Sequence, residues 1–557
     1  MKKKLIFIIG YIILACLFVV PFVKQNGFNF GWDMIFHLRR INELSLNIAR
    51  GNMHPYIYTF DFKSIGYPLG IFYPDLTLIP FAIMNLLFHN IVISTLCGIV
   101  FYNFLTLCVT HWMTYKITYN NLQSFFTAFL YTFSLYRIID IWTRFALGEF
   151  ICLTFLPLVL YGLYSILFEN YKDWPYLAFG LSLTMLTHVL STYIDIVFCI
   201  FVGLFALFFM KKNQFHKRIL ALCKSGLIFI LSSSVFIVPF IEQEITGNYS
   251  QPAPMKVSFY ASPFFNVFKS MLNNNLIGNY NWNRDEVFSV GLIGLIIIII
   301  GALNFRKFNS FEKIILLISI MLIVIQTNII PWSLFDNISL IDVIQFPFRD
   351  LGIASLLLSY LGGKEIVWAI TFNSNQFMQA TSILITIILI IIPWFSSINN
   401  WKMVNKNVYT IQTIKRSMAS NDYSTLNLND YTVHKGRESL KSVSEKHLGK
   451  IDDKNYYFTK IKSCPNSIEY TNLKVKKDQK IMLPFYNMTN IEVLLEGKKQ
   501  NISAAVNGLI TFNATRKSNS IIVRYKPSII DNLSIVISLL TWLLFFCSRL
   551  IKIKKID

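Results

Sequence analysis

The chain alternates long apolar runs with short polar segments. A run of about 20 apolar residues is long enough to cross the roughly 30 Å hydrocarbon core of a bilayer as a helix. The pattern therefore predicts an all-α polytopic membrane protein with about 12 transmembrane helices. The predicted spans lie near 5–23, 91–115, 122–136, 148–168, 175–188, 191–210, 217–242, 288–304, 312–331, 350–370, 378–396 and 529–549.

Composition supports this interpretation. Hydrophobic residues make up 54% of the 557 residues and charged residues only 15%, against roughly 25% charge in soluble domains. The net charge of +21 comes mainly from Lys and Arg in short loops and in one C-terminal polar segment. Such loops stay on the cytoplasmic side, so the charge indicates topology and contact with membrane lipids, and we expect no nucleic-acid partner.

Orientation follows from four basic clusters, at residues 2–4, 211–218, 306–307 and 552–555. With these inside, both termini are cytoplasmic. The first apolar run has no small-residue cleavage site after it, which predicts an uncleaved first helix in place of a signal peptide. Because the composition is biased toward Ile, Asn, Lys and Phe, we expect a multi-pass protein of a bacterial plasma membrane.

The polar segments define the predicted domains. Residues 1–396 form the transmembrane domain, with outer loops at 24–90, 137–147, 243–287 and 332–349. Residues 75–88 are apolar but too short to cross untilted, so we expect a juxtamembrane helix on the outer face. Short alternating runs in 397–528 predict an extracytoplasmic β-rich domain. Residues 529–557 form the last span and a basic tail.

The first outer loop holds the strongest candidate chemistry. Asp33 and His37 are spaced as i and i+4, which places both side chains on one face of a helix. A carboxylate there can take a proton from a hydroxyl, and Arg39 or Arg40 can hold a phosphate. The alternative is a solvated amphipathic helix that Asp33 caps.

Five motifs together resemble one bacterial membrane family. They are GWDMIFHLRRI at 31–41, GYPLGIFYPDL at 66–76, YRIIDIWTRFALGE at 136–149, LTH at 186–188 and IQFPFR at 344–349. Their order and spacing are similar to those of the pyruvoyl-tetrahydropterin-synthase-related membrane family, akin to YfhO-type proteins. That family in turn resembles the GT-C glycosyltransferases.

The resemblance implies a GT-C-like fold and a sugar donor linked to polyprenyl phosphate. It makes Asp33 the candidate catalytic base and Asp140 a second acidic residue. Neither loop contains an Asp-X-Asp pair, so a divalent metal, Mg or Mn, is only an open possibility and no metal ligand is assigned. Basic residues would then neutralise the leaving phosphate.

Four further residues are candidate substrate contacts. Arg144 and Glu149 lie at the outer end of a span, where they form either a structural ion pair or part of the binding site. Gln345 precedes Pro347 and Arg349, and this motif either holds a phosphate or lets Arg349 reach the interface.

Polar residues within an apolar stretch are a separate candidate. His188 and Asp195 lie there, where polar side chains are costly. They make either an interhelical hydrogen bond, or a proton relay or acceptor contact.

The sequence thus predicts a membrane glycosyltransferase, a hexosyltransferase or similar enzyme. It would act on the extracytoplasmic face and transfer a sugar to a cell-envelope glycopolymer such as teichoic acid or a surface polysaccharide. Two other classes remain open. One is a transporter or flippase of lipid-linked glycans, and the other is a non-catalytic envelope assembly protein.

Overall fold

The computed structural model describes residues 2–29, 31–207, 212–276, 287–372, 375–404, 408–419 and 428–554. Within these ranges, 7 helices are long and apolar enough to cross a membrane, and they establish a multi-pass membrane protein. They are α1 (Lys2–Gln25), α5 (Ile91–Thr118), α8 (Leu147–Phe168), α10 (Val189–Leu207), α18 (Leu351–Thr371), α19 (Gln376–Val404) and α22 (Ile529–Lys554). An eighth span is possible where α11 (Lys212–Ser232) and α12 (Ser234–Thr246) meet at 75°.

Four of the predicted spans form shorter helices than expected. These are α6 (Asn121–Thr132), α9 (Pro175–Met185), α15 (Gly291–Leu303) and α16 (Ser310–Ile325), with 12, 11, 13 and 16 residues. At about 1.5 Å per residue, none reaches the roughly 30 Å of a hydrocarbon core. The predicted number of about 12 spans is therefore not confirmed. The helix expected at 75–88 is present as α4 (Ile79–Phe88), preceded by a 3-10 turn.

The chain divides into two compact units. The first contains Met1–Met34, Leu96–Gly226 and Pro254–Ile411, and the second contains Ile35–Thr95, Leu227–Ala253 and Gln412–Asp557. The remaining helices are α2 (Met34–Ile48), α3 (Leu69–Phe72), α7 (Leu135–Ile138), α13 (Val257–Tyr260), α14 (Phe264–Asn273), α17 (Ser339–Asp342), α20 (Ile411–Ala419) and α21 (Leu440–Lys446). Each unit is described in turn.

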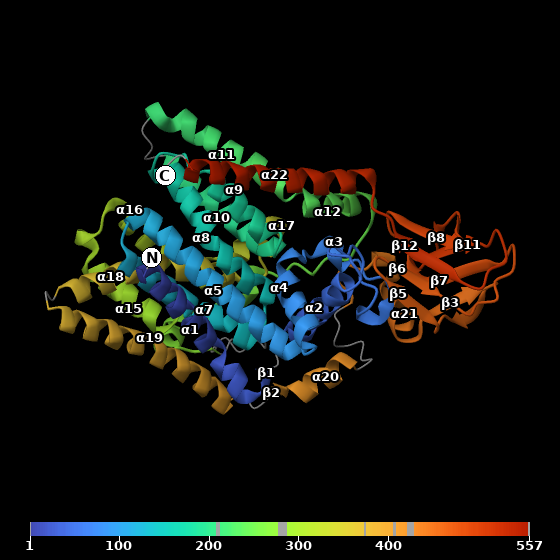
Figure 1. The fold of residues 1–557 in the computed structure, drawn as a ribbon, viewed down its shortest axis with the longest axis horizontal. Coiled ribbons are helices and arrows are strands. Elements are labelled where there is room, and N and C mark those ends of the chain that lie inside the picture. Colours follow the sequence, from blue (N-terminus) through green and yellow to red (C-terminus); the bar gives the residue numbers. More distant parts are fainter. Residues whose placement is uncertain are drawn as a thin grey trace. The chain divides into compact units, whose positions relative to one another are not determined.

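In the first unit, α18 is the central helix. It packs against α6, α15, α16 and α19, while α8 packs against α9 and α10 (Figure 1). Most side chains of α18 are buried, whereas α19 exposes Leu384, Leu389 and Ile392. Exposed aliphatic side chains on a long apolar helix suit contact with lipid. The helices α8 and α18 each present one end to the candidate site described below.

A short antiparallel pair closes this unit near the end of α1. Strand β1 (Gly27–Asn29) pairs with β2 (Val408–Thr410). A Cβ atom on Gly27 would lie 2.2 Å from the carbonyl oxygen of Tyr409, so only glycine allows this close approach. The pairing fixes the chain just before Asp33.

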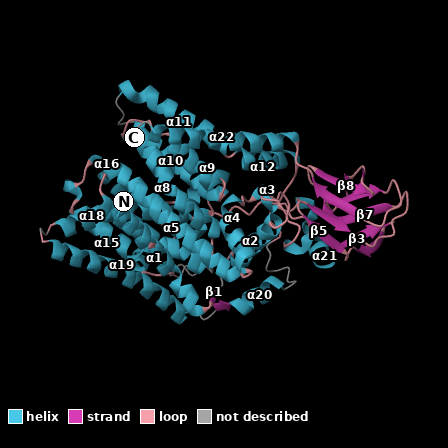
Figure 2. Ribbon diagram, viewed as in Figure 1, coloured by secondary structure: helices cyan, strands magenta, loops and turns pink. Residues whose placement is uncertain are grey.

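The second unit contains the predicted β-rich region, which Figure 2 shows in magenta. Two five-stranded antiparallel sheets have the orders β10-β11-β7-β3-β4 and β5-β6-β12-β8-β9. Side chains from both sheets form one buried core, including Leu483, Phe485, Val493 and Val523. The strands are β3 (Leu448–Ile451), β4 (Lys454–Tyr457), β5 (Ile461–Cys464), β6 (Ser467–Tyr470), β7 (Lys480–Tyr486), β8 (Ile491–Leu495), β9 (Lys498–Lys499), β10 (Ser503–Ala504), β11 (Leu509–Asn513) and β12 (Ile521–Tyr525). Helix α19 continues to Val404, past the predicted boundary at 397.

Candidate active site

Three contacts join the segment after α1 to the segment before α8. The side-chain amide of Asn29 donates to the carbonyl oxygen of Trp142 at 3.2 Å, and the backbone N–H of Asp33 donates to the carbonyl oxygen of Arg144 at 3.3 Å. Between them, a Cβ atom on Gly31 would lie 2.9 Å from the carbonyl oxygen of Arg144 and 2.5 Å from Cβ of Phe145. The two segments are therefore in backbone contact, which places Asp33 beside Arg144.

The segment that carries Asp140 and Arg144 has an irregular backbone. Residues Ile139–Arg144 form a π-helical turn between α7 and α8, and Phe145 ends it with a left-handed φ of 55°. A π turn contains one residue more per turn than an α-helix and often occurs at functional sites. Here it presents Asp140 and Arg144 to each other, with Arg144 Nη1 2.7 Å from Asp140 Oδ1.

Arg144 is the centre of a buried ion-pair cluster. Besides Asp140, its Nη2 atom donates to Glu149 Oε2 at 2.9 Å, and its Nη1 atom lies 3.2 Å from the hydroxyl oxygen of Tyr136. The Tyr136 hydroxyl donates to the other oxygen of Glu149. All four side chains are buried. An ion pair is therefore present at this helix start, and both terminal nitrogens of Arg144 are engaged, while its Nε atom has no partner among the described residues.

Asp140 is enclosed within this cluster. Its side chain is fully buried, and one carboxylate oxygen is bound by Arg144. Burial raises the pKa of Asp140, and the neighbouring Glu149 carboxylate raises it further against the opposing effect of Arg144. An enclosed carboxyl has no access to an incoming hydroxyl, so Asp140 suits a positioning role.

Arg349 has more unused hydrogen-bonding capacity than Arg144, which lacks a partner among the described residues only at Nε. Arg349 lies in the 3-10 turn Pro347–Asp350, which leads directly into α18. Its Nε atom is 3.8 Å from Glu149 Oε2. Within the described ranges, its buried Nε and Nη1 atoms have no hydrogen-bond partner. Buried N–H groups that lack a hydrogen-bond acceptor are costly. These N–H groups are therefore suited to an anionic ligand such as a phosphate.

Asp33 has an exposed side chain whose pKa is nevertheless shifted by the surrounding protein. Its side chain is exposed, and no hydrogen bond or ion pair to any described residue occupies its carboxylate. Desolvation nevertheless raises the pKa of Asp33 and Glu149 adds to this effect, while Arg144 and Arg349 oppose it. Solvent access together with a raised pKa is the combination expected of a general base.

Aromatic side chains line the same region. The ring of Trp32 lies 6.1 Å from that of Phe288 and 6.4 Å from that of Phe346, which stacks on Phe348 at 5.1 Å. The guanidinium carbon of Arg144 is 5.1 Å from the Phe348 ring centre. No role for these rings follows from the sequence pattern, although aromatic residues stand on either side of Pro347.

Three predicted residues do not join this cluster. Arg39 pairs with Asp61 at 2.5 Å, and Arg40 pairs with Asp75 at 2.8 Å, all within the second compact unit. His37 is buried, with Nδ1 3.5 Å from Nη1 of Arg40. Because carboxylates already neutralise both guanidinium groups, we leave these residues out of the phosphate site.

The other predicted residues lie near helix starts in the first unit. His188 directly precedes α10, and its Nδ1 atom is 2.8 Å from the hydroxyl of Ser191. Asp195 is buried further along α10. Gln345 has a left-handed φ of 65°, which turns the chain into Pro347 and so positions Arg349. Part of the loop predicted at 243–287, residues 277–286, lies outside the described residues.

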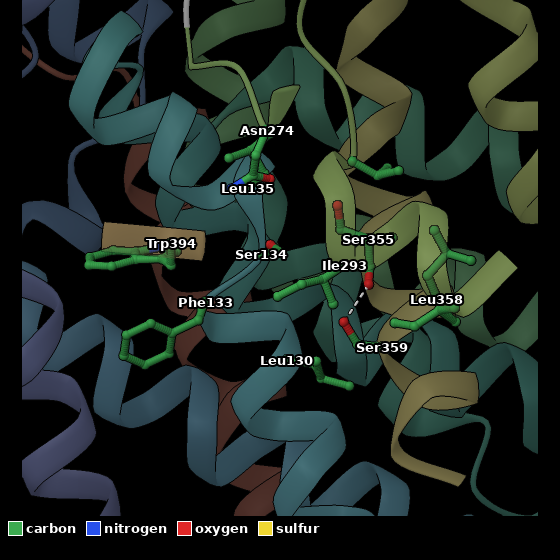
Figure 3. Close-up of a pocket in the computed structure, with 13 residues that line it drawn as sticks. Leu130, Phe133, Ser134, Leu135, Asn274, Ile293, Ser355, Leu358, Ser359 and Trp394 are labelled. Carbon is green, nitrogen blue, oxygen red and sulfur yellow. Dashed lines mark hydrogen bonds between the residues drawn. The ribbon is translucent and has the colours of Figure 1, made fainter. Parts of the chain in front are cut away.

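A small cavity opens further along α18, as Figure 3 shows. Ser355 and Ser359 line it, with the Ser359 hydroxyl donating to the Ser355 carbonyl oxygen at 2.6 Å. The buried Ser355 Oγ and Trp394 Nε1 atoms have no hydrogen-bond partner among the described residues. Ordered water is the usual partner for such atoms.

A divalent cation does not fit the ion-pair cluster. Both oxygens of Glu149 and Oδ1 of Asp140 already accept hydrogen bonds from Arg144 or Tyr136, which leaves Asp140 Oδ2 as a single buried oxygen without a partner among the described residues. Across the residues that the structure describes, no group of three or more His, Cys, Asp and Glu side chains is placed to hold a metal ion. Mg²⁺ prefers several oxygen ligands at about 2.0–2.1 Å in octahedral geometry. No catalytic step is therefore derived through Mg or Mn.

Comparison with known proteins gives limited similarity. No protein-family model matches the chain, and no curated protein sequence matches it, so the family resemblance predicted from the motifs is not confirmed. ArnT from Cupriavidus metallidurans bound to undecaprenyl phosphate aligns with a TM-score of 0.35 and 11% identity, over 78% of this chain and 79% of that chain. The apo structure of the same protein aligns at 0.30 and 11%, over 65% and 79%.

Proposed function

We propose that this protein is a GT-C-like membrane glycosyltransferase, which moves a sugar from a polyprenyl-phosphate-linked donor to a hydroxyl group of an acceptor. One arrangement carries the proposal. The exposed carboxylate of Asp33 has no partner among the described residues, and the Asp33 backbone binds the carbonyl oxygen of Arg144. Arg349 contacts the same Glu149 as Arg144 and retains unused N–H groups. A free base beside an anion-binding cation is the minimum that glycosyl transfer from a phosphate requires.

In the proposed reaction, Asp33 accepts the proton of the acceptor hydroxyl. The hydroxyl oxygen forms a new bond to the anomeric carbon of the sugar. The bond between that carbon and the phosphate oxygen breaks, and its electron pair leaves with the polyprenyl phosphate. The proton remains on Asp33 until solvent removes it, so atoms and charge balance without a further reactant.

Arg349 supplies the charge that stabilises the departing phosphate. Its Nε and Nη1 atoms have hydrogen-bonding capacity available, and the low dielectric around them strengthens their interaction with an anion. The orientation of the Arg349 guanidinium relative to the phosphate matters, because guanidinium groups bind phosphate in a fixed planar geometry. Glu149, 3.8 Å from Nε, orients the side chain without neutralising it fully.

Arg144, Asp140 and Tyr136 act as positioning residues in this account. Their hydrogen bonds fix Glu149 and the π-helical turn, and the carbonyl oxygen of Arg144 holds the backbone of Asp33. Each of these side chains is bound to another member of the network, which gives the turn a fixed geometry. The predicted role of Asp140 as a second catalytic acid is accordingly replaced by positioning.

The cellular setting follows from the predicted topology. With both termini cytoplasmic, Asp33 lies on the extracytoplasmic face, where a cell-envelope glycopolymer such as teichoic acid or a surface polysaccharide provides acceptor hydroxyls. The basic β-rich region suits contact with an anionic polymer on that face.

The test is mass spectrometry of envelope polymers from cells with the intact gene, a deletion, and Asp33→Asn expressed at equal level. Loss of one sugar in both the deletion and the variant is expected. A variant that keeps the sugar that the deletion loses would contradict catalysis at Asp33 and favour transport or assembly. Asp478→Asn, at an exposed carboxylate in the β-rich region, is the control for loss of a carboxylate outside the proposed site.

A further inference from the structure

A second cavity in the first unit has no part in the proposed reaction. It lies between α15, α18 and α19, which run near one another in Figure 1, and its volume is about 700 Å³. That volume is within the roughly 300–1,000 Å³ of small-molecule sites. Its walls are largely aliphatic, formed by Leu130, Ile293, Ile296, Ile297, Ile300, Ile366, Leu389 and Ile390.

A buried carboxyl group lines this apolar cavity. Glu365 is 7% exposed, and its Oε1 atom has no hydrogen-bond partner among the described residues. The neighbouring Lys364 does not satisfy it, because that ammonium pairs with Glu312. A polar group buried without a partner costs about 1–3 kcal/mol, and an ionisable residue inside a membrane span is by default a candidate for function.

A cation and an amide line the same cavity where α15 ends. Asn304 follows the helix, and Lys307 closes the 3-10 turn after it with an exposed side chain. Glu365 lies six residues before the end of α18 at Thr371, about 9 Å along the helix axis. The cavity thus combines a cation, a carboxyl and a long apolar wall.

We propose that this cavity binds one diacyl phospholipid with an anionic headgroup. The phosphate pairs with Lys307, the carboxyl group of Glu365 donates a hydrogen bond to an ester carbonyl, and an acyl chain lies along the aliphatic wall. The cation, the carboxyl group and the aliphatic wall of the cavity thus contact the phosphate, the ester and the acyl chain of the lipid. Since the basic cluster at 306–307 is predicted to be cytoplasmic, the lipid belongs to the cytoplasmic leaflet. This site is independent of the proposed glycosyl transfer.

The test is native mass spectrometry of the full chain in detergent, titrated with phosphatidylglycerol or with phosphatidylcholine. We expect one retained phosphatidylglycerol, bound about fivefold more tightly than phosphatidylcholine. Lys307→Gln should remove this preference. Arg306→Gln is the matched control, because that exposed arginine lies in the same turn but does not line the cavity.

Variants at two further positions distinguish lipid bound in the cavity from lipid bound elsewhere on the protein surface. Ala369→Trp fills the cavity from a position with an exposed side chain and should abolish retention of both lipids. Glu365→Gln keeps a hydrogen-bond donor and should retain the lipid, whereas Glu365→Leu should lose it. Equal phosphatidylglycerol binding by Lys307→Gln and Arg306→Gln, or full retention by Ala369→Trp, would overturn the proposal.

Discussion

The backbone N–H of Asp33 donates a hydrogen bond to the carbonyl oxygen of Arg144, at 3.3 Å. The same arginine holds Asp140 and Glu149 through its side chain. The residue proposed as the base is thus anchored through its backbone while its carboxylate stays unoccupied. The backbone hydrogen bond therefore fixes the position of Asp33, while its carboxylate stays available for the reaction.

Gly31→Ala should damage the site through packing alone. The added Cβ would lie 2.5 Å from Cβ of Phe145 and 2.9 Å from the backbone of Arg144, so one segment must move. We expect a loss of about 1–3 kcal/mol in stability and a fall in activity, since Asp33 shifts with the backbone. Thermal unfolding and sugar transfer measure the two effects. Gly10→Ala, which meets nothing within 4 Å, is the control; equal behaviour of the two variants would refute the close approach.

Arg349→Gln should weaken binding of polyprenyl phosphate about 10-fold or more, because charge-assisted hydrogen bonds to the phosphate are lost. Arg349→Lys keeps the positive charge but loses the planar guanidinium group, so its affinity should lie between those of Arg349→Gln and the wild type. Binding to the purified protein in nanodiscs measures both, with the exposed Arg306→Gln as a control. Unchanged affinity in Arg349→Gln would remove this residue from the phosphate site.

Arg40→Gln should act on folding and leave donor binding intact. The substitution leaves Asp75 buried without its cation, and breaking a buried pair costs about 3–5 kcal/mol. The melting temperature should fall, while the donor affinity of the folded fraction stays within about twofold of the wild type. A selective loss of affinity at an unchanged melting temperature would return Arg40 to the binding site.

The pH dependence of kcat/KM should show an acidic limb set by Asp33. A base acts in its ionised form, so activity falls as the pH drops through its pKa. Since desolvation raises the pKa of Asp33, the midpoint should lie above the value of about 4 for an ordinary aspartate. Residual activity in Asp33→Asn should lack this limb. A limb that persists in the variant belongs to another group.

The sequence predicted the elements well where the pattern is local. Runs such as 148–168 and 529–549 form long helices, because the length and apolar composition of such a stretch are enough to predict a helix. Alternating residues likewise predicted the strands of β7 and β12. The helix α9 ends at Met185 with 11 residues, and apolar composition alone could not show that end.

The site was less predictable, because its contacts join distant segments. The motif at 136–149 correctly suggested an ion pair, since Arg144 and Glu149 are close in sequence. The partners of Arg39 and Arg40 lie 22 and 35 residues away, and no local pattern reveals them. The π-helical turn at Ile139–Arg144 also has no sequence signature, although it determines which side chains meet.

Asp33 is the proposed base for sugar transfer. The most direct test is the single-turnover rate of polyprenyl phosphate release by purified wild type and Asp33→Asn, using the donor that envelope analysis identifies. Binding of the donor is measured on the same samples. We predict a fall of about 10²–10⁴-fold in rate with donor affinity nearly unchanged, the contribution expected of a general base. A variant that releases polyprenyl phosphate at the wild-type rate would contradict the account.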